Sequence, residues 1–470
     1  MTNSIGNAVA AGTIFALMLA TAGPARSDPL GDAEIGNLSR AILFGTSVQK
    51  TEAVGKLVAR GKTDVVASLI LASRYRRIDG EIMEAINTLT GQSLSGWHEA
   101  MLWQETHPEV KPHSSFRTLK TSVFKNIDPA FERFVGGDRS KPENMKIRFE
   151  EITWGGVPVD GIPALDNPEL IDAPQATYLA NSDLVFGVEI NGDVRAYPLR
   201  IMGWHEMFNE TIGGVPVALA YCTLCGAGIL FETTVEGRDE PFVFGSSGFL
   251  YRSNKLMFDR QTDSLWNQFT GEPVTGPLVD SGFKLKIRPL VITTWENWKE
   301  SNPTTKVLSL DTGHTRDYGS GVVYRDYFAS PDLMFPATVS NEKDLRAKDY
   351  VFGIRDFGAA KAWPISAFEN MAVINDRVGG RNIVLVGDAK SRTVRAYERA
   401  DNEFEKSEKP GHLSLAGRAL AGKDWAMRED FLVGPEGTKL PRIAGHISYW
   451  FAWDGYLGVK SELYSAKDRS

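Results

Sequence analysis

Two cysteines separated by two residues form the pattern with the most distinctive chemistry in this sequence. Cys222 and Cys225 are the only cysteines of the chain, and Gly226 follows them directly. In an oxidising compartment such a pair forms a disulfide, binds a metal ion or exchanges electrons as a thiol–disulfide couple. A framework of several disulfides is excluded.

The residues around the pair indicate two strands joined by a tight turn. Residues 215–221 are largely apolar, and residues 227–232 (Ala-Gly-Ile-Leu-Phe-Glu) are typical of a return strand. In a thioredoxin-like centre a helix would begin here instead. The pattern therefore favours the knuckle of a metal site, in which Gly226 takes a positive φ and both sulfurs face one ion.

Two sulfurs supply half of a metal site, so we expect further ligands. His205, on a helix that leads into the same strand, is the histidine nearest to the pair in the sequence. Sulfur together with imidazole suits copper or zinc. We therefore predict a copper or zinc ion bound by Cys222, Cys225 and His205. Further candidate ligands are Met202, Met207, His314 and His446.

Three polar residues could act beside this centre. They are Glu206, which follows His205, and the neighbours Asp259 and Arg260. If the centre is catalytic, we expect these side chains to position a substrate or to move protons. The alternative for Asp259 and Arg260 is a capped hairpin turn with an internal ion pair between Arg and a carboxylate. No pattern indicates the class of a small-molecule substrate.

The N-terminus predicts export. An apolar run from Ala8 to Ala22 and the small residues up to Ser27 indicate a signal peptide over 1–27, and hence a periplasmic or secreted protein. No later run of about 18 apolar residues predicts a membrane span. A net charge of −7, with scattered Lys and Arg, argues against nucleic-acid binding.

Two kinds of periodicity predict an α+β fold. Residues 28–110 have apolar positions at helical spacing, interrupted by glycines, which indicates a HEAT-like array of antiparallel helices that could dock a protein partner. From about Asp138, short runs rich in β-branched and aromatic residues predict a mainly antiparallel β domain. The aromatic segment 445–453 is expected to be a strand that closes the core.

An internal repeat organises the β domain. Residues 183–222 align with residues 349–388 without a gap, and they share Val-Phe-Gly, Gly-Gly and several single positions. We therefore predict an internal duplication with repeat units near 183–222 and 349–388. His205 aligns with Met371 and Cys222 with Asp388, so only the first unit is expected to carry the site.

A series of motifs resembles a known family. Together they are similar, over about residues 138–460, to the bacterial and archaeal family catalogued as domain of unknown function 3179. The resemblance implies export and places the region of His205 and Cys222 in the family signature, and it implies no reaction. The motifs are Arg195 to Leu199, Trp204 to Glu206, Gly213-Gly214, Tyr221 to Gly226, Asp259 to Thr262, Ser264 to Trp266 and the segment that begins at His446.

Three functions follow from these observations. The leading prediction is an exported metal-binding protein, with copper or zinc, whose metal could serve an oxidoreductase reaction. The second is a non-catalytic periplasmic module that binds a protein partner and contains a structural disulfide. The third is a thiol–disulfide redox protein.

Overall fold

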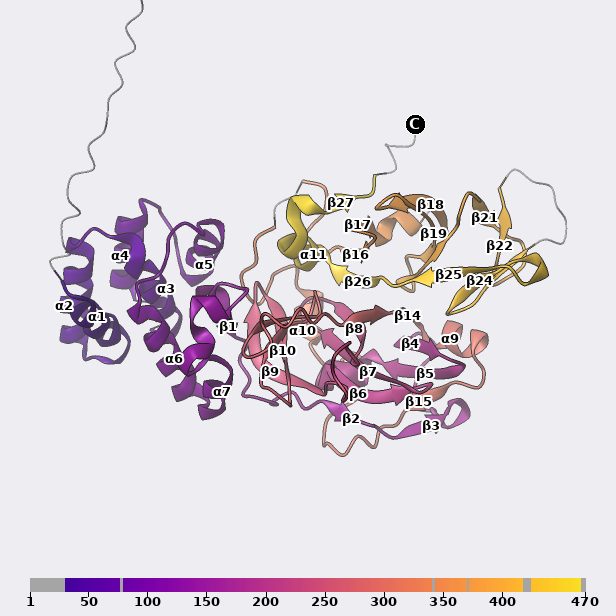
Figure 1. Ribbon diagram of the computed structural model, residues 1–470, viewed down its shortest axis with the longest axis horizontal. Helices are drawn as coiled ribbons and strands as arrows, with labels where there is room; N and C mark the ends of the chain where they lie inside the picture. Colours follow the sequence, from indigo (N-terminus) through magenta and orange to yellow (C-terminus); the bar gives the residue numbers. More distant parts are fainter. Residues whose placement is uncertain (1–29, 77–78, 340–342, 370–371, 417–423, 466–470) are drawn as a thin grey trace, which may run out of the picture.

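The fold consists of an N-terminal helical part and a larger part built from β sheets, which Figure 1 shows side by side. The computed structural model describes residues 30–76, 79–339, 343–369, 372–416 and 424–465. The predicted signal peptide lies outside the described residues. Helices followed by sheets confirm the predicted α+β class.

A central helix organises the N-terminal part. Helix α3 is buried from Val66 to Ala72 and contacts α1, α4, α5 and α6. Because this stretch is apolar on nearly all sides, its neighbours must enclose it. Helices continue past residue 110, and the HEAT-like comparison stays a prediction. The helices are α1 (Asp32–Phe44), α2 (Ser47–Ala59), α3 (Val66–Tyr75), α4 (Gly80–Thr90), α5 (Trp97–Thr106), α6 (Ser115–Ile127) and α7 (Glu132–Val135).

The strands of the β part form five sheets among the described residues. In spatial order, the first is β1 (Ile152–Trp154), β9 (Phe244–Tyr251), β10 (Asn254–Asp259), β11 (Leu265–Asn267) and β12 (Glu272–Thr275). The second is β13 (Lys286–Arg288), β8 (Ala227–Glu232), β7 (Val215–Cys222), β6 (Met207–Ile212) and β2 (Leu165–Asp166). The third is β14 (Val291–Thr294), β4 (Leu184–Ile190), β5 (Asp193–Pro198), β15 (Lys306–Leu308) and β3 (Leu170–Asp172).

The last two sheets come from the C-terminal half of the chain. The fourth is β26 (His446–Tyr449), β16 (Tyr350–Asp356), β17 (Ala359–Pro364) and β27 (Glu462–Leu463). The fifth is β18 (Val373–Val378), β19 (Arg381–Asp388), β20 (Thr393–Glu398), β25 (Lys439–Ile443), β24 (Phe431–Val433), β23 (Trp425–Met427), β22 (His412–Leu415) and β21 (Phe404–Lys406). Helices between these strands are α8 (Leu199–His205), α9 (Trp295–Ser301), α10 (Arg325–Ala329) and α11 (Trp450–Leu457).

The helical part and the first sheet share an aromatic core. Phe131 stacks on Phe249 with ring centroids 4.4 Å apart, and Phe134 lies 4.9 Å from Phe258. All four rings are buried. Burial of a phenylalanine side chain contributes about 1.5–3 kcal/mol. The helices are therefore packed firmly against the β part.

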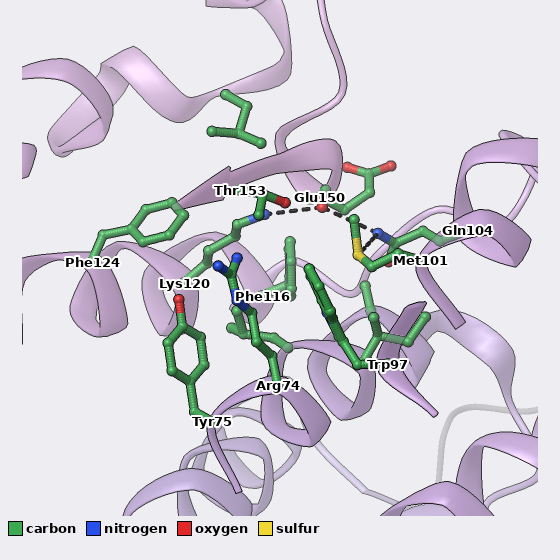
Figure 2. Close-up of a pocket in the computed structure, with 14 residues that line it drawn as sticks. Arg74, Tyr75, Trp97, Met101, Gln104, Phe116, Lys120, Phe124, Glu150 and Thr153 are labelled. Carbon is green, nitrogen blue, oxygen red and sulfur yellow. Dashed lines mark hydrogen bonds between the residues drawn. The ribbon is translucent and has the colours of Figure 1, made fainter. Parts of the chain in front are cut away.

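A small cavity lies in this junction, between α3, α6 and β1 (Figure 2). Its volume is about 20 Å³, which is room for about one water molecule. Lys120 of α6 reaches into it and donates hydrogen bonds to the carbonyl oxygens of Phe149 and Glu150, at 2.7 and 3.0 Å. Burial lowers the pKa of Lys120 to about 7. In the folded protein, the side chain of Lys120 can therefore lose its positive charge near neutral pH.

One arrangement of strands occurs twice along the chain. Hairpin β4–β5 is followed by α8, hairpin β6–β7 and β8, while hairpin β16–β17 is followed by a 3₁₀ turn, hairpin β18–β19 and β20. The pairing agrees as well, because Gly187 faces Ala196 in the first hairpin and Gly353 faces Ala362 in the second. Strand β14 extends the first hairpin beside β4, and β26 extends the second beside β16.

The two arrangements also pack a tryptophan in the same way. Gly187 lies against Trp298 of α9, and Gly353 lies against Trp453 of α11. A Cβ atom would come within 2.4 Å of the ring at Gly187 and within 1.8 Å at Gly353. Both positions therefore require glycine, because the backbone approaches an aromatic ring closely.

The prediction of a strand over residues 445–453 is wrong for the second half of that segment. Strand β26 ends at Tyr449 and helix α11 begins at Trp450. The residues from Trp450 to Asp454 are all buried. A short, continuous apolar run does not distinguish a buried strand from a buried helix, and the prediction failed for that reason.

Candidate functional site

The cysteine pair lies in the turn between β7 and β8, and the predicted return strand is confirmed. Cys222 and Cys225 form a disulfide with their Cα atoms 5.3 Å apart, and both are buried. Gly226 has a φ of 58°, as predicted, and its Cα faces the rings of Tyr350 and Tyr449. The left-handed backbone and the crowded surroundings both favour glycine at this position.

The sulfur of Cys225 faces oxygen atoms. Its Sγ lies 3.0 Å from Oδ1 of Asn254 and 3.4 Å from the carbonyl oxygen of Ser253. The backbone N–H of Lys255 donates to the same Oδ1 at 2.9 Å and so orients the amide. A thiol would donate a hydrogen bond to one of these oxygens, whereas a disulfide sulfur has no hydrogen to donate. After reduction, these two oxygens are therefore acceptors within reach of the Cys225 thiol.

A buried ion pair lies beside the turn. Glu206 follows α8 and accepts hydrogen bonds from Nζ of Lys255 at 2.9 Å and from the hydroxyl of Thr223 at 2.7 Å. All three side chains are buried. Removal of one partner from such a pair leaves an unpaired charge, at a cost of about 3–5 kcal/mol. The structure thus connects Glu206 to the cysteine turn, and its catalytic role stays a prediction.

His205 is the last residue of α8 and is buried. Its Nδ1 lies 2.9 Å from the carbonyl oxygen of Pro163, and its Nε2 lies 2.6 Å from the hydroxyl of Tyr318. Burial lowers the pKa of His205 to about 4, so the ring is neutral at pH 7. Nδ1–H therefore donates to the carbonyl, and Nε2 accepts from the tyrosine. Both ring nitrogens have partners other than the cysteines.

The other predicted ligands lie in different surroundings. The ring of His314 lies 5.2 Å from that of His205, and His446 packs against the ring of Phe269 at 4.9 Å. Met202 and Met207 are buried in the apolar core. Among the described residues, no group of three or more His, Cys, Asp or Glu side chains is arranged to hold a metal ion. Ligation of copper or zinc by Cys222, Cys225 and His205 stays a prediction.

Asp259 and Arg260 lie in the turn between β10 and β11. Asp259 accepts hydrogen bonds from the N–H of Thr262 at 2.6 Å and from Nε1 of Trp266 at 2.8 Å. Arg260 pairs with Asp160 at 2.9 Å, so its carboxylate partner comes from a distant segment. These contacts are those of a capped turn, and the proposed catalytic role of both residues stays a prediction.

Residues 309–339, here called the cover segment, pass over α8 and the cysteine turn. Nε1 of Trp204 donates to the carbonyl oxygen of Asp317 at 2.8 Å. The hydroxyl of Tyr327 donates to the carbonyl oxygen of Leu224, inside the turn, at 2.6 Å. Burial raises the pKa of Tyr327, so its hydroxyl remains protonated at neutral pH. The cover segment is therefore attached both to α8 and to the cysteine turn.

The second unit closes the corresponding turn without sulfur. Asp388 aligns with Cys222 and Ser391 with Cys225, at the same end of the equivalent strand pair. The hydroxyl of Ser391 donates to the carboxylate of Asp388 at 2.5 Å. A hydrogen bond across this turn is therefore sufficient, and the turn itself does not require a disulfide.

Three residues around the cysteine pair were not predicted from the sequence. Asn254 and Lys255 begin β10, directly before the apolar residues 256–258. An ionisable residue within an otherwise apolar strand indicates a buried partner, and this signal was present in the sequence. Tyr327 stands in a segment without clear periodicity, and no local signal indicated its contact with Leu224.

Fold and site together define an α+β protein with two similarly paired β units and one buried disulfide turn. The chain belongs to the family described as Protein of unknown function (DUF3179), whose model matches residues 159–459, more than half of the chain. This membership confirms the resemblance seen in the sequence. No curated protein and no solved structure matches the chain. Within the described part of the chain, no helix has the length and apolar character needed to cross a membrane.

Proposed function

We propose that this chain is an exported thiol–disulfide redox protein whose centre is the pair Cys222 and Cys225. The observation that carries the proposal is the contact between Sγ of Cys225 and Oδ1 of Asn254, at 3.0 Å. This oxygen is an acceptor for a thiol proton. The reduced pair is therefore stabilised relative to the disulfide, as expected for a couple that must be reduced reversibly.

The proposed reaction is exchange with a dithiol of a partner protein. After the cover segment opens, a partner thiolate attacks Sγ of Cys222, which has 2% exposure while Cys225 has none. The S–S bond breaks and Cys225 leaves as a thiolate, which takes up a proton from water; the resulting thiol donates a hydrogen bond to Oδ1 of Asn254. The second thiolate of the partner then attacks the partner sulfur of the mixed disulfide. Cys222 leaves as a thiolate and takes up a proton from water. Two electrons and two protons pass from the partner to the pair.

A structural role accounts less well for the pair. The corresponding turn of the second unit is closed by the hydrogen bond between Ser391 and Asp388. A disulfide across so short a loop also restricts the unfolded chain little, and its stabilisation is about 2 kcal/mol. The fold therefore has little need of this disulfide.

Copper or zinc ligation by Cys222, Cys225 and His205 is the competing proposal. Acceptor oxygens beside Cys225 disfavour the thiolate that such a metal requires. The ring nitrogens of His205 already have partners, at 2.9 and 2.6 Å. The contacts around these residues therefore support the redox proposal better.

We also infer that the two β units are copies of one ancestral unit. One support is a shared polar contact, in which Glu210 binds Arg195 and Tyr197 in the first unit. Asp376 binds Lys361 and Trp363 at the aligned positions of the second. Recognition of a protein partner through the helical part remains a proposal.

The test begins with protein purified from the periplasm, incubated under native conditions with dithiothreitol. Free thiols are then alkylated and counted by mass spectrometry. We expect both cysteines to become reduced and then to reoxidise without unfolding. A pair that is reduced only after denaturation contradicts the proposal. Stoichiometric copper or zinc in the purified protein, lost in Cys225→Ser and in His205→Ala but retained in Asp388→Ala, favours the metal proposal instead.

A further inference from the structure

A cavity of about 480 Å³ lies between the two β units and the cover segment. Binding sites for small molecules usually have volumes of about 300–1,000 Å³. The first unit contributes Arg200 and Tyr221 to the cavity, and the cover segment contributes Phe328. Arg392 and Tyr449 belong to the C-terminal half. Residues far apart in the sequence thus form one site.

The cavity carries positive charge that the described residues do not neutralise. The guanidinium of Arg392 lies over the ring of Tyr350, 4.6 Å from its centroid, and has no carboxylate or other hydrogen-bond partner among the described residues. Lys348 donates to the carbonyl oxygens of Tyr327 and Ser330; the carboxylate of Asp332 acts on it only from beyond ion-pair distance, and no ion pair forms among the described residues. A ligand of negative charge would complement both groups.

A third cation in the cavity is already neutralised. Nη1 of Arg200 pairs with Asp183 at 2.9 Å and also donates to the carbonyl oxygen of Tyr178 at 2.8 Å. Two cations thus remain for a ligand, and Arg392 presents the fork of donors that matches an oxyanion.

The backbone of Arg392 has the same left-handed conformation as the glycine at the aligned position of the first unit. Its φ is 53°, and the aligned residue of the first unit is Gly226, with a φ of 58°. Glycine adopts this conformation without strain, whereas arginine does not. At the cavity, this turn conformation is combined with a guanidinium that lies over the ring of Tyr350.

We propose that this cavity binds a small organic oxyanion, a carboxylate or a phosphate monoester with a flat aromatic body. Arg392 binds the oxyanion, and Lys348 adds a second positive charge. The ring of Phe328, which is 40% exposed, and the half-buried ring of Tyr350 line the cavity and provide an aromatic surface for the body of the ligand. This proposal does not depend on the redox function of the cysteines.

The test is isothermal titration of the oxidised full chain with benzoate, phenyl phosphate and inorganic phosphate, with benzyl alcohol as the uncharged control. We expect saturable binding of benzoate or phenyl phosphate, weaker binding of inorganic phosphate and none of benzyl alcohol. Whichever of benzoate and phenyl phosphate binds more tightly identifies the preferred head group. Arg392→Gly should weaken binding at least tenfold and should not lower the thermal midpoint, because glycine relieves the strained backbone.

The matched control is Ala400→Gly, which changes another residue with positive φ, 48°, outside the cavity. We expect it to leave the affinity unchanged. Absence of saturable binding of all three anions to the wild type overturns the proposal. Binding that survives in Arg392→Gly with the affinity of the wild type also overturns it.

Discussion

The carboxamide of Asn254 stands in direct contact with the sulfur of Cys225. Its oxygen already accepts the N–H of Lys255 at 2.9 Å, which prevents the amide from turning its NH₂ group to the sulfur without the loss of that bond. The proposed redox role of the pair therefore depends on this acceptor beside the buried cysteine.

Asn254→Ala should make the disulfide harder to reduce. The substitution removes an acceptor for the thiol of Cys225, and such a hydrogen bond contributes about 0.5–1.5 kcal/mol. For a two-electron couple this corresponds to a reduction potential lower by about 10–30 mV. Equilibration with glutathione buffers measures the shift. Asn209→Ala, which removes another buried amide, is the control, and an equal shift in the control would refute the role of Asn254.

The pKa of Lys120 makes stability depend on pH. Its pKa is lowered to about 7 in the folded protein by burial, with Glu150, Glu151 and Arg74 as its charged neighbours, and is 10.5 in the unfolded chain. Between these values the unfolded chain binds one more proton, so the free energy of unfolding rises with pH by about 1.4 kcal/mol per unit.

Lys120→Met should remove this slope between about pH 8 and pH 10. Urea unfolding across that range measures it. Lys125→Met, on the same helix but half exposed, serves as the control and should keep the slope of the wild type. If the slopes of the wild type and of Lys120→Met agree, the lysine is not neutralised on folding.

Among the elements around the site, we expect the cover segment to control access to the sulfurs. Tyr327→Phe removes its hydrogen bond to Leu224. Because such a bond contributes about 0.5–1.5 kcal/mol, we expect native-state reduction by dithiothreitol to become about three- to tenfold faster. Tyr397→Phe, which removes a hydroxyl to carbonyl bond in the second unit, should leave the rate unchanged. An unchanged rate in Tyr327→Phe would show that opening of this contact does not limit reduction.

The turn between β7 and β8 should survive without its sulfur bond. Replacement of both Cys222 and Cys225 by serine permits a hydroxyl hydrogen bond across the turn, by analogy with Ser391 and Asp388. We expect a folded protein with an unfolding free energy lower by about 2 kcal/mol. Circular dichroism and urea unfolding measure this. Loss of the folded state would indicate a structural disulfide.

At this scale the sequence predicted some elements well and others poorly. The turn at Gly226 and the return strand β8 were predicted because glycine and alternating apolar residues act locally. Helix α11 was missed because its apolar run is buried on all sides. The contacts of Asn254 with Cys225 and of Tyr327 with Leu224 join distant segments, and no local spacing encodes them.

For the whole molecule, the α+β class followed from two clear periodicities. The packing of Phe131 on Phe249 joins the helical part to the first sheet, and the periodicities did not indicate it. The aligned units were visible in the sequence, whereas the cavity between them depends on the cover segment and on the side chain of Arg392. Sites between units arise from tertiary packing, and a sequence pattern within one unit does not locate them.

The reduction potential of the Cys222–Cys225 pair in the full chain distinguishes a redox centre from a structural disulfide. The protein is equilibrated in glutathione or dithiothreitol buffers of known potential, and its thiols are alkylated and counted by mass spectrometry. A redox centre stabilised in its reduced form should have a potential above about −270 mV, in the range of thiol–disulfide proteins. A potential below about −300 mV, where structural disulfides lie, would contradict the account.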